Sequence, residues 1–136
     1  RDFSYSLRDT GLTKLNEDVV VPRSRLVELV EFAHSLQEET GIAIACFGHA
    51  GDGNIHTNLM VKDYEDPSIR AQADSALDRL FTWILENQGV ITGEHGVGLA
   101  KKRWFPDAVG KEGVATHSAV KTALDPRGIL NPGKFI

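Results

Sequence analysis

Two histidines seven residues apart, His49 and His56, are the side chains of this sequence best suited to bind a metal ion. Between them lies Gly51-Asp-Gly-Asn54, and aliphatic runs flank the whole segment. Asp-Gly between apolar runs is typical of a tight β-hairpin, because a type I′ turn needs positive φ at both central residues. With Asp52 and Gly53 at those positions, His49 opposes His56, and their Cβ atoms lie about 4.5–5.5 Å apart on one face. The spacing therefore predicts two imidazoles that share one metal ion.

A third ligand is expected from the polar segment Thr92–Gly96. Glu94 offers a carboxylate there, although a solvated carboxylate favoured by a helix dipole explains it equally well. Two histidines and one glutamate leave a coordination position open for water or substrate, which is the pattern of a catalytic metal site. Zinc suits this ligand set, while iron(II) and manganese stay open because the same set describes non-haem iron sites.

Two further polar residues could act on a bound substrate. His95 follows Glu94 and would face the same cleft from the side, which suits a general base with a pKa near neutral pH. Asn58 follows His56 by two residues and shares its strand face, so it can donate a hydrogen bond to a substrate oxygen. The alternative for Asn58 is an amide bound to the neighbouring backbone.

The elements that hold these residues can be predicted from hydrophobic periodicity and from glycine and proline positions. In chain order we expect a loop at 1–15, strand 18–21, helix 24–40, a hairpin over 42–62, helix 66–87, strand 90–92, helices 96–104 and 106–124, and an irregular tail. The order β-α-β-β-α-β predicts an α+β fold, the ferredoxin-like α/β plait, with extra C-terminal helices. In that plait the fourth strand lies beside the first, which allows Glu94 to approach the hairpin.

Composition excludes several classes of protein. The 136 residues and 41% hydrophobic content suffice for one compact core. A net charge of −4 with interspersed acids and bases argues against a nucleic-acid partner. The sequence has no apolar run of membrane-spanning length and no secretion signal at its start, so we expect a cytoplasmic protein whose membrane association, if any, is made through partners. Cys46 is the single cysteine, which excludes an internal disulfide and favours a small buried side chain on the face opposite His49.

Three motifs of the chain resemble the C-terminal domain of the FAD-linked oxidase family, which includes D-lactate dehydrogenases, the glycolate oxidase flavin subunit and D-2-hydroxyglutarate dehydrogenase. They are Gly48-His-Ala-Gly-Asp-Gly-Asn-Ile-His-Thr-Asn58, Ile91-Thr-Gly-Glu-His-Gly-Val-Gly98 and Leu124-Asp-Pro-Arg-Gly-Ile-Leu-Asn-Pro-Gly-Lys134, with Glu17-Asp-Val-Val-Val-Pro22 as a weaker fourth. The resemblance covers essentially the whole chain in order.

The resemblance implies a flavoenzyme that oxidises a D-2-hydroxy acid, of the D-lactate or glycolate type, to the 2-oxo acid. Hydride would pass to FAD, and electrons would continue to a cytochrome, a quinone or another carrier protein. It implies that His49, His56 and Glu94 hold a divalent metal, usually zinc, and that His95 takes the hydroxyl proton. The remaining implied contacts are Asn58, Arg1 and Lys14 with the substrate and Asn131 with the flavin.

The family's flavin-binding domain is amino-terminal and is absent from this sequence. Because the chain opens on Arg1, we expect residues 1–136 to be the C-terminal part of an FAD-linked oxidase, inactive alone and with little or no affinity for FAD. Two rival interpretations use the same residues. One is a metal-dependent hydrolase in which His95 or Glu94 activates water. The other is a non-catalytic ferredoxin-like module whose histidines are structural.

Overall fold

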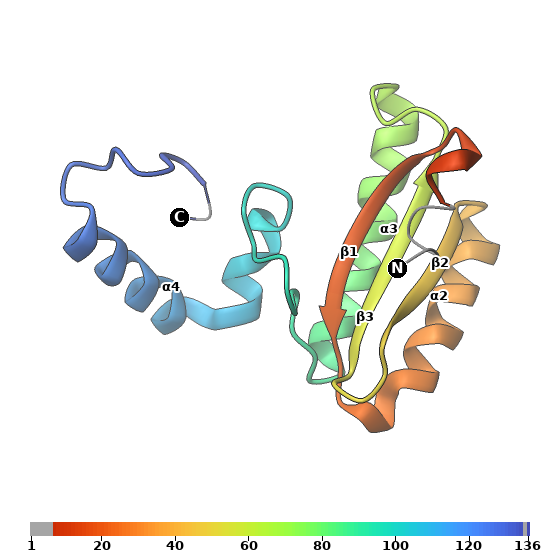
Figure 1. Ribbon diagram of the computed structural model, residues 1–136, viewed down its shortest axis with the longest axis horizontal. Coiled ribbons are helices and arrows are strands. Elements are labelled where there is room, and N and C mark those ends of the chain that lie inside the picture. Colours follow the sequence, from red (N-terminus) through yellow and green to blue (C-terminus); the bar gives the residue numbers. More distant parts are fainter. Residues whose placement is uncertain (1–6, 135) are drawn as a thin grey trace. The chain divides into compact units, whose positions relative to one another are not determined.

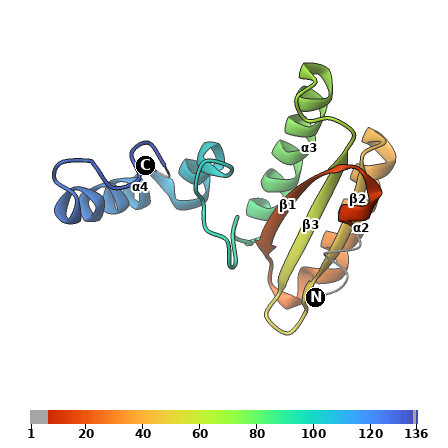
Figure 2. The same cartoon turned by 45° about the horizontal axis from the view of Figure 1, so that its top comes forward.

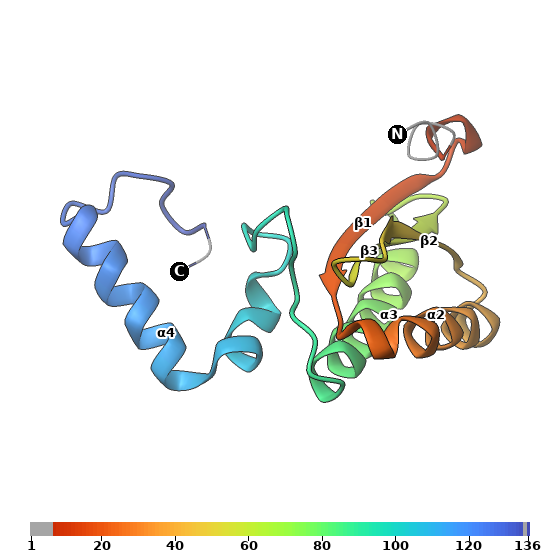
Figure 3. The ribbon, with the colours of Figure 1, turned by 60° about the horizontal axis from the view of Figure 1, so that its bottom comes forward.

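The computed structural model describes residues 7–134 and 136, which form two compact units with a boundary between Gly93 and Glu94. The first unit contains an antiparallel sheet in the order β1-β3-β2, from β1 (Thr13–Val20), β2 (Ala43–His49) and β3 (Asn54–Val61). Helices α2 (Leu26–Thr40) and α3 (Pro67–Glu86) cover one face of this sheet (Figures 1 and 3). This arrangement confirms the predicted α+β, ferredoxin-like fold.

Both long helices form where the periodicity predicts them, because their apolar stripes and stop signals are local. Asp66 caps α3 by accepting hydrogen bonds from the backbone N–H groups of Ser68 (2.8 Å) and Ile69 (3.2 Å). Gly41 ends α2 with a φ of 68°. Their apolar faces bury the core against the sheet. Its fully enclosed members include Val19, Leu29, Leu36, Leu59, Leu80, Phe81 and Ile84.

The central strand β3 separates an apolar face from a polar one, because successive side chains point to opposite sides of a sheet. Ile55, Leu59 and Val61 are buried with the core on the helix-covered side. The opposite face, here called the open face, carries the alternate residues Asn54, His56 and Asn58. Cys46 pairs with Thr57 and so lies on the helix-covered side, as predicted, where burial raises the pKa of its thiol.

The first strand begins earlier than predicted: β1 starts at Thr13, inside the segment expected to be a loop. Most residues at its start are polar, so hydrophobicity alone does not predict a strand there. They stand opposite polar residues of β3, since Asn16 pairs with Asn58 and Asp18 with His56. Pairing across the sheet, rather than local preference, extends this strand.

The predicted fourth strand, 90–92, is reduced to a single antiparallel bridge between Val90 and Val20. Val20 and Val90 exchange both backbone hydrogen bonds, at 3.1 and 2.8 Å. The backbone pairing with β1 ends at this bridge. In the next residues, the Thr92 hydroxyl and the Gly93 N–H both donate hydrogen bonds to the Asp18 carboxylate instead. The bridge still lies beside β1, where the plait places its fourth strand (Figure 2).

The hairpin between β2 and β3 is wider than predicted. The structure pairs His49 with Asn54 and Phe47 with His56, which leaves a four-residue loop, 50–53, in place of a two-residue turn. Asp52 does not adopt the positive φ that a type I′ turn requires, and only Gly53 does, at 73°. The prediction that His49 directly opposes His56 is therefore wrong. The shift equals two residues, so both histidines still share one face of the sheet.

The second unit contains a 3₁₀ turn, η3 (Lys102–Trp104), and helix α4 (Phe105–Leu124). The helix predicted over 96–104 is thus limited to η3. Helix α4 is bent at Gly110, whose φ of 70° and ψ of 176° are not helical. Over the described residues, no helix combines the length and the apolar character needed to cross a membrane.

Candidate metal centre

The open face of the sheet is lined by polar side chains that the strand register brings together. His56, on the central strand, has Asp18 of β1 on one side and Phe47 of β2 on the other. The Phe47 and His56 ring centroids lie 5.4 Å apart, so the aromatic ring supports one flank of the imidazole. A half-buried histidine held between two strands is a rigid position for a ligand.

His49 lies diagonally across the same face from His56. Their ring centroids are 6.4 Å apart, and the ring planes meet at 73°. Both side chains emerge from strand ends next to the hairpin loop, His49 as an exposed residue and His56 as a half-buried one. The diagonal arrangement gives the two rings room to direct one nitrogen each toward a common point.

Glu94 completes a set of possible ligands with the two histidines. One ligand atom from each of His49, His56 and Glu94 lies within 4.8 Å of the other two. Ligand atoms around one tetrahedral zinc ion lie about 3.4 Å apart, given metal–ligand distances of about 2.1 Å. His49 and Glu94 are exposed, so rotation of their side chains can close this difference. Two nitrogens and one carboxylate oxygen fit a divalent metal with a coordination position left for substrate.

The whole chain matches one known family. A model of the FAD-linked oxidases, C-terminal domain, covers residues 1–135. The chain belongs to this family.

Relatives of the chain include proteins named as oxidoreductases. It is 39% identical over 123 residues to the glycolate oxidase subunit GlcD of Bacillus subtilis, an alignment that covers 90% of this chain and 26% of the relative. It is 36% identical over 118 residues to a D-lactate dehydrogenase of Anaerostipes hadrus, with 87% and 25% covered. It is 37% identical over 123 residues to a mitochondrial D-lactate dehydrogenase [cytochrome] of Arabidopsis thaliana, with 88% and 21% covered. The chain thus spans about a quarter of the length of the relatives first matched.

The predicted substrate residues of this FAD-linked oxidase domain occupy different settings. Lys14 pairs with Met60 and shares the strand face of Asn16 and Asp18, which is the open face. Asn58 is fully buried, and its Nδ2 donates to the carbonyl oxygens of Ala45 (3.0 Å) and His56 (3.1 Å). The structure therefore shows the backbone-bound alternative for this amide. Arg1 lies outside the described residues.

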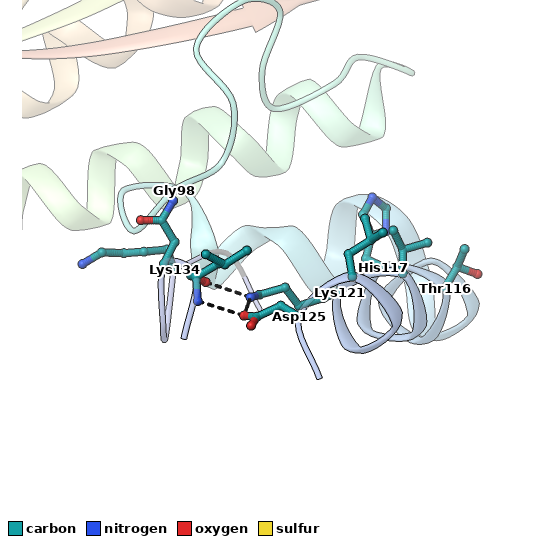
Figure 4. A pocket seen from close by; sticks show the side chains of 10 residues that line it. Gly98, Thr116, His117, Lys121, Asp125 and Lys134 are labelled. Carbon is teal, nitrogen blue, oxygen red and sulfur yellow. Dashed lines mark hydrogen bonds and ion pairs between the residues drawn. The ribbon is translucent and has the colours of Figure 1, made fainter. Parts of the chain in front are cut away.

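His95 and Asn131, the other predicted site residues, are both exposed. His95 follows Glu94 directly in the chain. Asn131 belongs to the tail of the second unit, where its φ of 46° marks a turn. It lines a cavity of about 750 Å³ together with apolar residues of α4 and with Lys134 (Figure 4). The roles of both residues stay predictions.

The tail that carries Asn131 is fastened to α4 by one carboxylate. Asp125 accepts hydrogen bonds from the backbone N–H groups of Ile129 (3.0 Å) and Leu130 (2.9 Å) and forms an ion pair with Lys121 (Figure 4). The Lys121 ammonium and then the Leu130 N–H hold the pKa of the Asp125 carboxyl below its ordinary value. This network fixes the tail against the end of the helix.

We expect Asp125→Ala to release the tail, so that the amides of Ile129 and Leu130 exchange with deuterium at least tenfold faster in hydrogen-exchange mass spectrometry. Because folding lowers the pKa of Asp125, the anchoring is fully present above the ordinary value of about 3.9 and is lost as pH falls through the lowered value. Asp107→Ala, which removes an exposed carboxylate from the first turn of α4, serves as the control. Unchanged exchange in Asp125→Ala would contradict this account.

Sequence reasoning missed one residue of the site, Asp18. Its position in Glu17-Asp-Val-Val-Val-Pro22 suggested the start of a short strand and a weaker family motif, but no role in the site. The sequence feature that could have identified Asp18 is an acidic residue in an apolar run, since a buried acid usually has a specific partner. Only the register with His56 and the two bonds to residues 92 and 93 reveal that partner.

Proposed function

We propose that this chain is the substrate- and metal-binding part of a flavin-dependent D-2-hydroxyacid dehydrogenase of the D-lactate or glycolate type. The observation that carries the proposal is the cluster of His49, His56 and Glu94 on the open face of the sheet. Family membership and the names of the relatives support the reaction class. The flavin would be bound mainly by residues outside this chain, and the electron acceptor would be a cytochrome, a quinone or a carrier protein.

The three ligands would hold a divalent cation, with zinc as the best match to two nitrogens and one carboxylate. When bound, such a cation favours the deprotonated form of a hydroxyl oxygen, as it does for water. The flavin, when bound, supplies the two-electron acceptor for the hydride of the substrate carbon. The remaining chemistry belongs to this chain: binding the acid, orienting it and accepting one proton.

Residues of this chain are suited to those tasks. The Lys14 ammonium lies on the open face and can pair with a substrate carboxylate. His95 is exposed beside Glu94, so a bound substrate can reach its imidazole, which is suited to accept the hydroxyl proton. Oxidation then removes one proton and one hydride from the 2-hydroxy acid and leaves the 2-oxo acid. Arg1 completes the proposed carboxylate contact, and Asn131 the proposed flavin contact.

The two rival functions account for less of the chain. A hydrolase would use the same ligands but gives no role to the tail motif that ends at Lys134, which family membership explains. A purely structural role for the histidines does not explain an exposed His49 with a ligand atom within 4.8 Å of those of His56 and Glu94. Both observations favour the dehydrogenase.

A steady-state screen of the full-length protein tests the proposal. D-lactate, glycolate and D-2-hydroxyglutarate are each supplied with a dye acceptor, before and after treatment with a chelator. We expect turnover of at least one acid, loss of that turnover after chelation and its return when zinc, manganese or iron(II) is added back. Turnover that survives complete metal removal would overturn the metal role. Ester or peptide hydrolysis without any oxidation would favour the hydrolase.

A further inference from the structure

We infer that Asp18 is the positioning residue of the proposed metal centre: one buried carboxylate fastens the segment that leads to Glu94 and stands beside His56. The inference rests on the metal role proposed above and assigns to it a residue outside the ligand set. It concerns geometry and charge within the first unit, where each contact of Asp18 described below lies.

The carboxylate of Asp18 holds the two residues that precede Glu94. Its Oδ2 accepts a hydrogen bond from the Thr92 hydroxyl at 3.1 Å and another from the Gly93 backbone N–H at 2.9 Å. Two residues earlier, Val90 is bound to Val20 through both of its backbone groups. The chain therefore leaves β1 with its direction set by four hydrogen bonds. Because Glu94 comes next, the starting point of its side chain is set as well.

Close packing at Gly93 makes this attachment tight. A Cβ atom at position 93 would lie 2.5 Å from Asn54 Nδ2 and 2.8 Å from Val20 Cγ2. Only glycine allows the backbone to approach β1 and β3 this closely. The N–H of Gly93 is thereby brought within reach of Asp18.

The same carboxylate stands next to the imidazole of His56. Asp18 and His56 are directly paired residues of β1 and β3, so both side chains lie on the open face with Cβ atoms about 4.5–5.5 Å apart. A carboxylate beside a ligand histidine favours one orientation of the ring and raises its basicity toward a metal. Asp18 thus acts on two of the three proposed ligands from a single position.

The burial of Asp18 argues that its charge serves a purpose other than stability. The side chain is 0% exposed on a strand where the next residue, Val19, is also fully enclosed. Removing a carboxylate from water is unfavourable unless specific hydrogen bonds or opposite charges compensate for it. An acid retained there, with its oxygen directed at the ligand segment, fits a positioning role.

Metal binding by the chelator-treated full-length protein tests the inference, with Zn²⁺ and Co²⁺ as the titrants. We expect Asp18→Asn to weaken Zn²⁺ binding about 10- to 100-fold and to change the visible spectrum of the Co²⁺ form. Thr92→Val, which removes one of the two hydrogen bonds, should weaken binding about 3- to 10-fold, and Thr92→Ser should restore it. The midpoint of thermal unfolding, measured in excess chelator, shows whether each variant is folded independently of its metal binding.

Two matched controls lie on the helix-covered side of the same strand pair. Glu17→Gln removes a buried carboxylate next to Asp18 in sequence, and Thr57→Val makes the same exchange as Thr92→Val. Both should leave the Zn²⁺ affinity within about twofold of the unmodified protein. They separate the proposed effect from a general loss of sheet stability.

The outcomes distinguish this inference from the function on which it rests. An unmodified protein without stoichiometric metal would overturn the proposed function, and this inference with it. Stoichiometric metal whose affinity is unchanged in Asp18→Asn would overturn the inference alone. If Asp18→Asn does not fold, Thr92→Val and Thr92→Ser decide the question in a protein that keeps its carboxylate, and equal affinities of these two variants overturn it.

Discussion

We expect the replacement of His49 and His56 together by alanine to abolish the proposed metal binding and to lower the proposed oxidation of a 2-hydroxy acid by about a thousandfold or more. The reason is that two of the three proposed ligands disappear at once, which leaves one exposed carboxylate. Lewis-acid assistance is worth several kcal/mol, and each ~1.4 kcal/mol changes a rate tenfold. Elemental analysis of the purified full-length protein and steady-state rates with a dye acceptor measure the two effects.

Thermal unfolding supplies a readout that does not depend on activity. A ligand that binds only the native state raises the unfolding temperature, so chelation should lower the midpoint of the unmodified protein but not that of the double variant. His34→Ala is the matched control, because His34 is an exposed histidine on α2, the helix-covered side of the same unit. A double variant that retains stoichiometric metal would place the ion elsewhere.

Gly53→Ala should destabilise the protein by about 2–4 kcal/mol in urea unfolding. Position 53 has a φ of 73°, where a residue with a Cβ atom pays about 1–2 kcal/mol. The new Cβ would also lie 2.1 Å from the carbonyl oxygen of Val21, a backbone atom that cannot rotate away. Overpacking of this kind costs about 1–3 kcal/mol. Relief of the clash would break the hydrogen bond from Val21 N–H to the Gly53 oxygen.

Gly51→Ala provides the control within the same loop. Position 51 does not have positive φ, and a Cβ atom there meets no atom within 4 Å. This substitution should be neutral or should stabilise the protein by about 0.4–1 kcal/mol, because alanine restricts the unfolded chain. Equal stabilities of the two variants would show that the hairpin tolerates another loop conformation. Since the loop joins the strands of His49 and His56, Gly53→Ala should also weaken metal binding.

The helices were predictable from sequence because their signals are local. The apolar stripe of α3, its Asp66-Pro67 start and the glycine that ends α2 all act within a few residues of the backbone that they shape. The strands were less predictable. Polar residues at the start of β1 become strand through backbone pairing with β3, in which Asn58 and His56 stand opposite Asn16 and Asp18. Such pairing partners are more than 30 positions away in the sequence, so a local pattern cannot reveal them.

The hairpin shows where local turn chemistry fails. Asp52-Gly53 predicted a two-residue turn, yet the structure has a four-residue loop. Contacts with residues outside the loop favour the four-residue loop over the two-residue turn. The Val21 N–H donates a hydrogen bond to the Gly53 oxygen. The two strands also approach so closely that a Cβ atom at Gly48 would lie 2.2 Å from the Asn54 oxygen. These contacts fix the register between β2 and β3, and this register determines which residues of the two strands stand opposite each other.

The amino-acid sequence by itself determined the kinds of ligand available, the shared face of His49 and His56, and the family. Strand parity survives a register shift of two residues, because side chains alternate with a period of two along any strand. Only the tertiary structure decided the diagonal placement of the two rings, the approach of Glu94 and the hydrogen bonds between Asp18 and the segment before Glu94. These features depend on how closely distant segments pack, which is a property of the folded chain rather than of any short stretch of it.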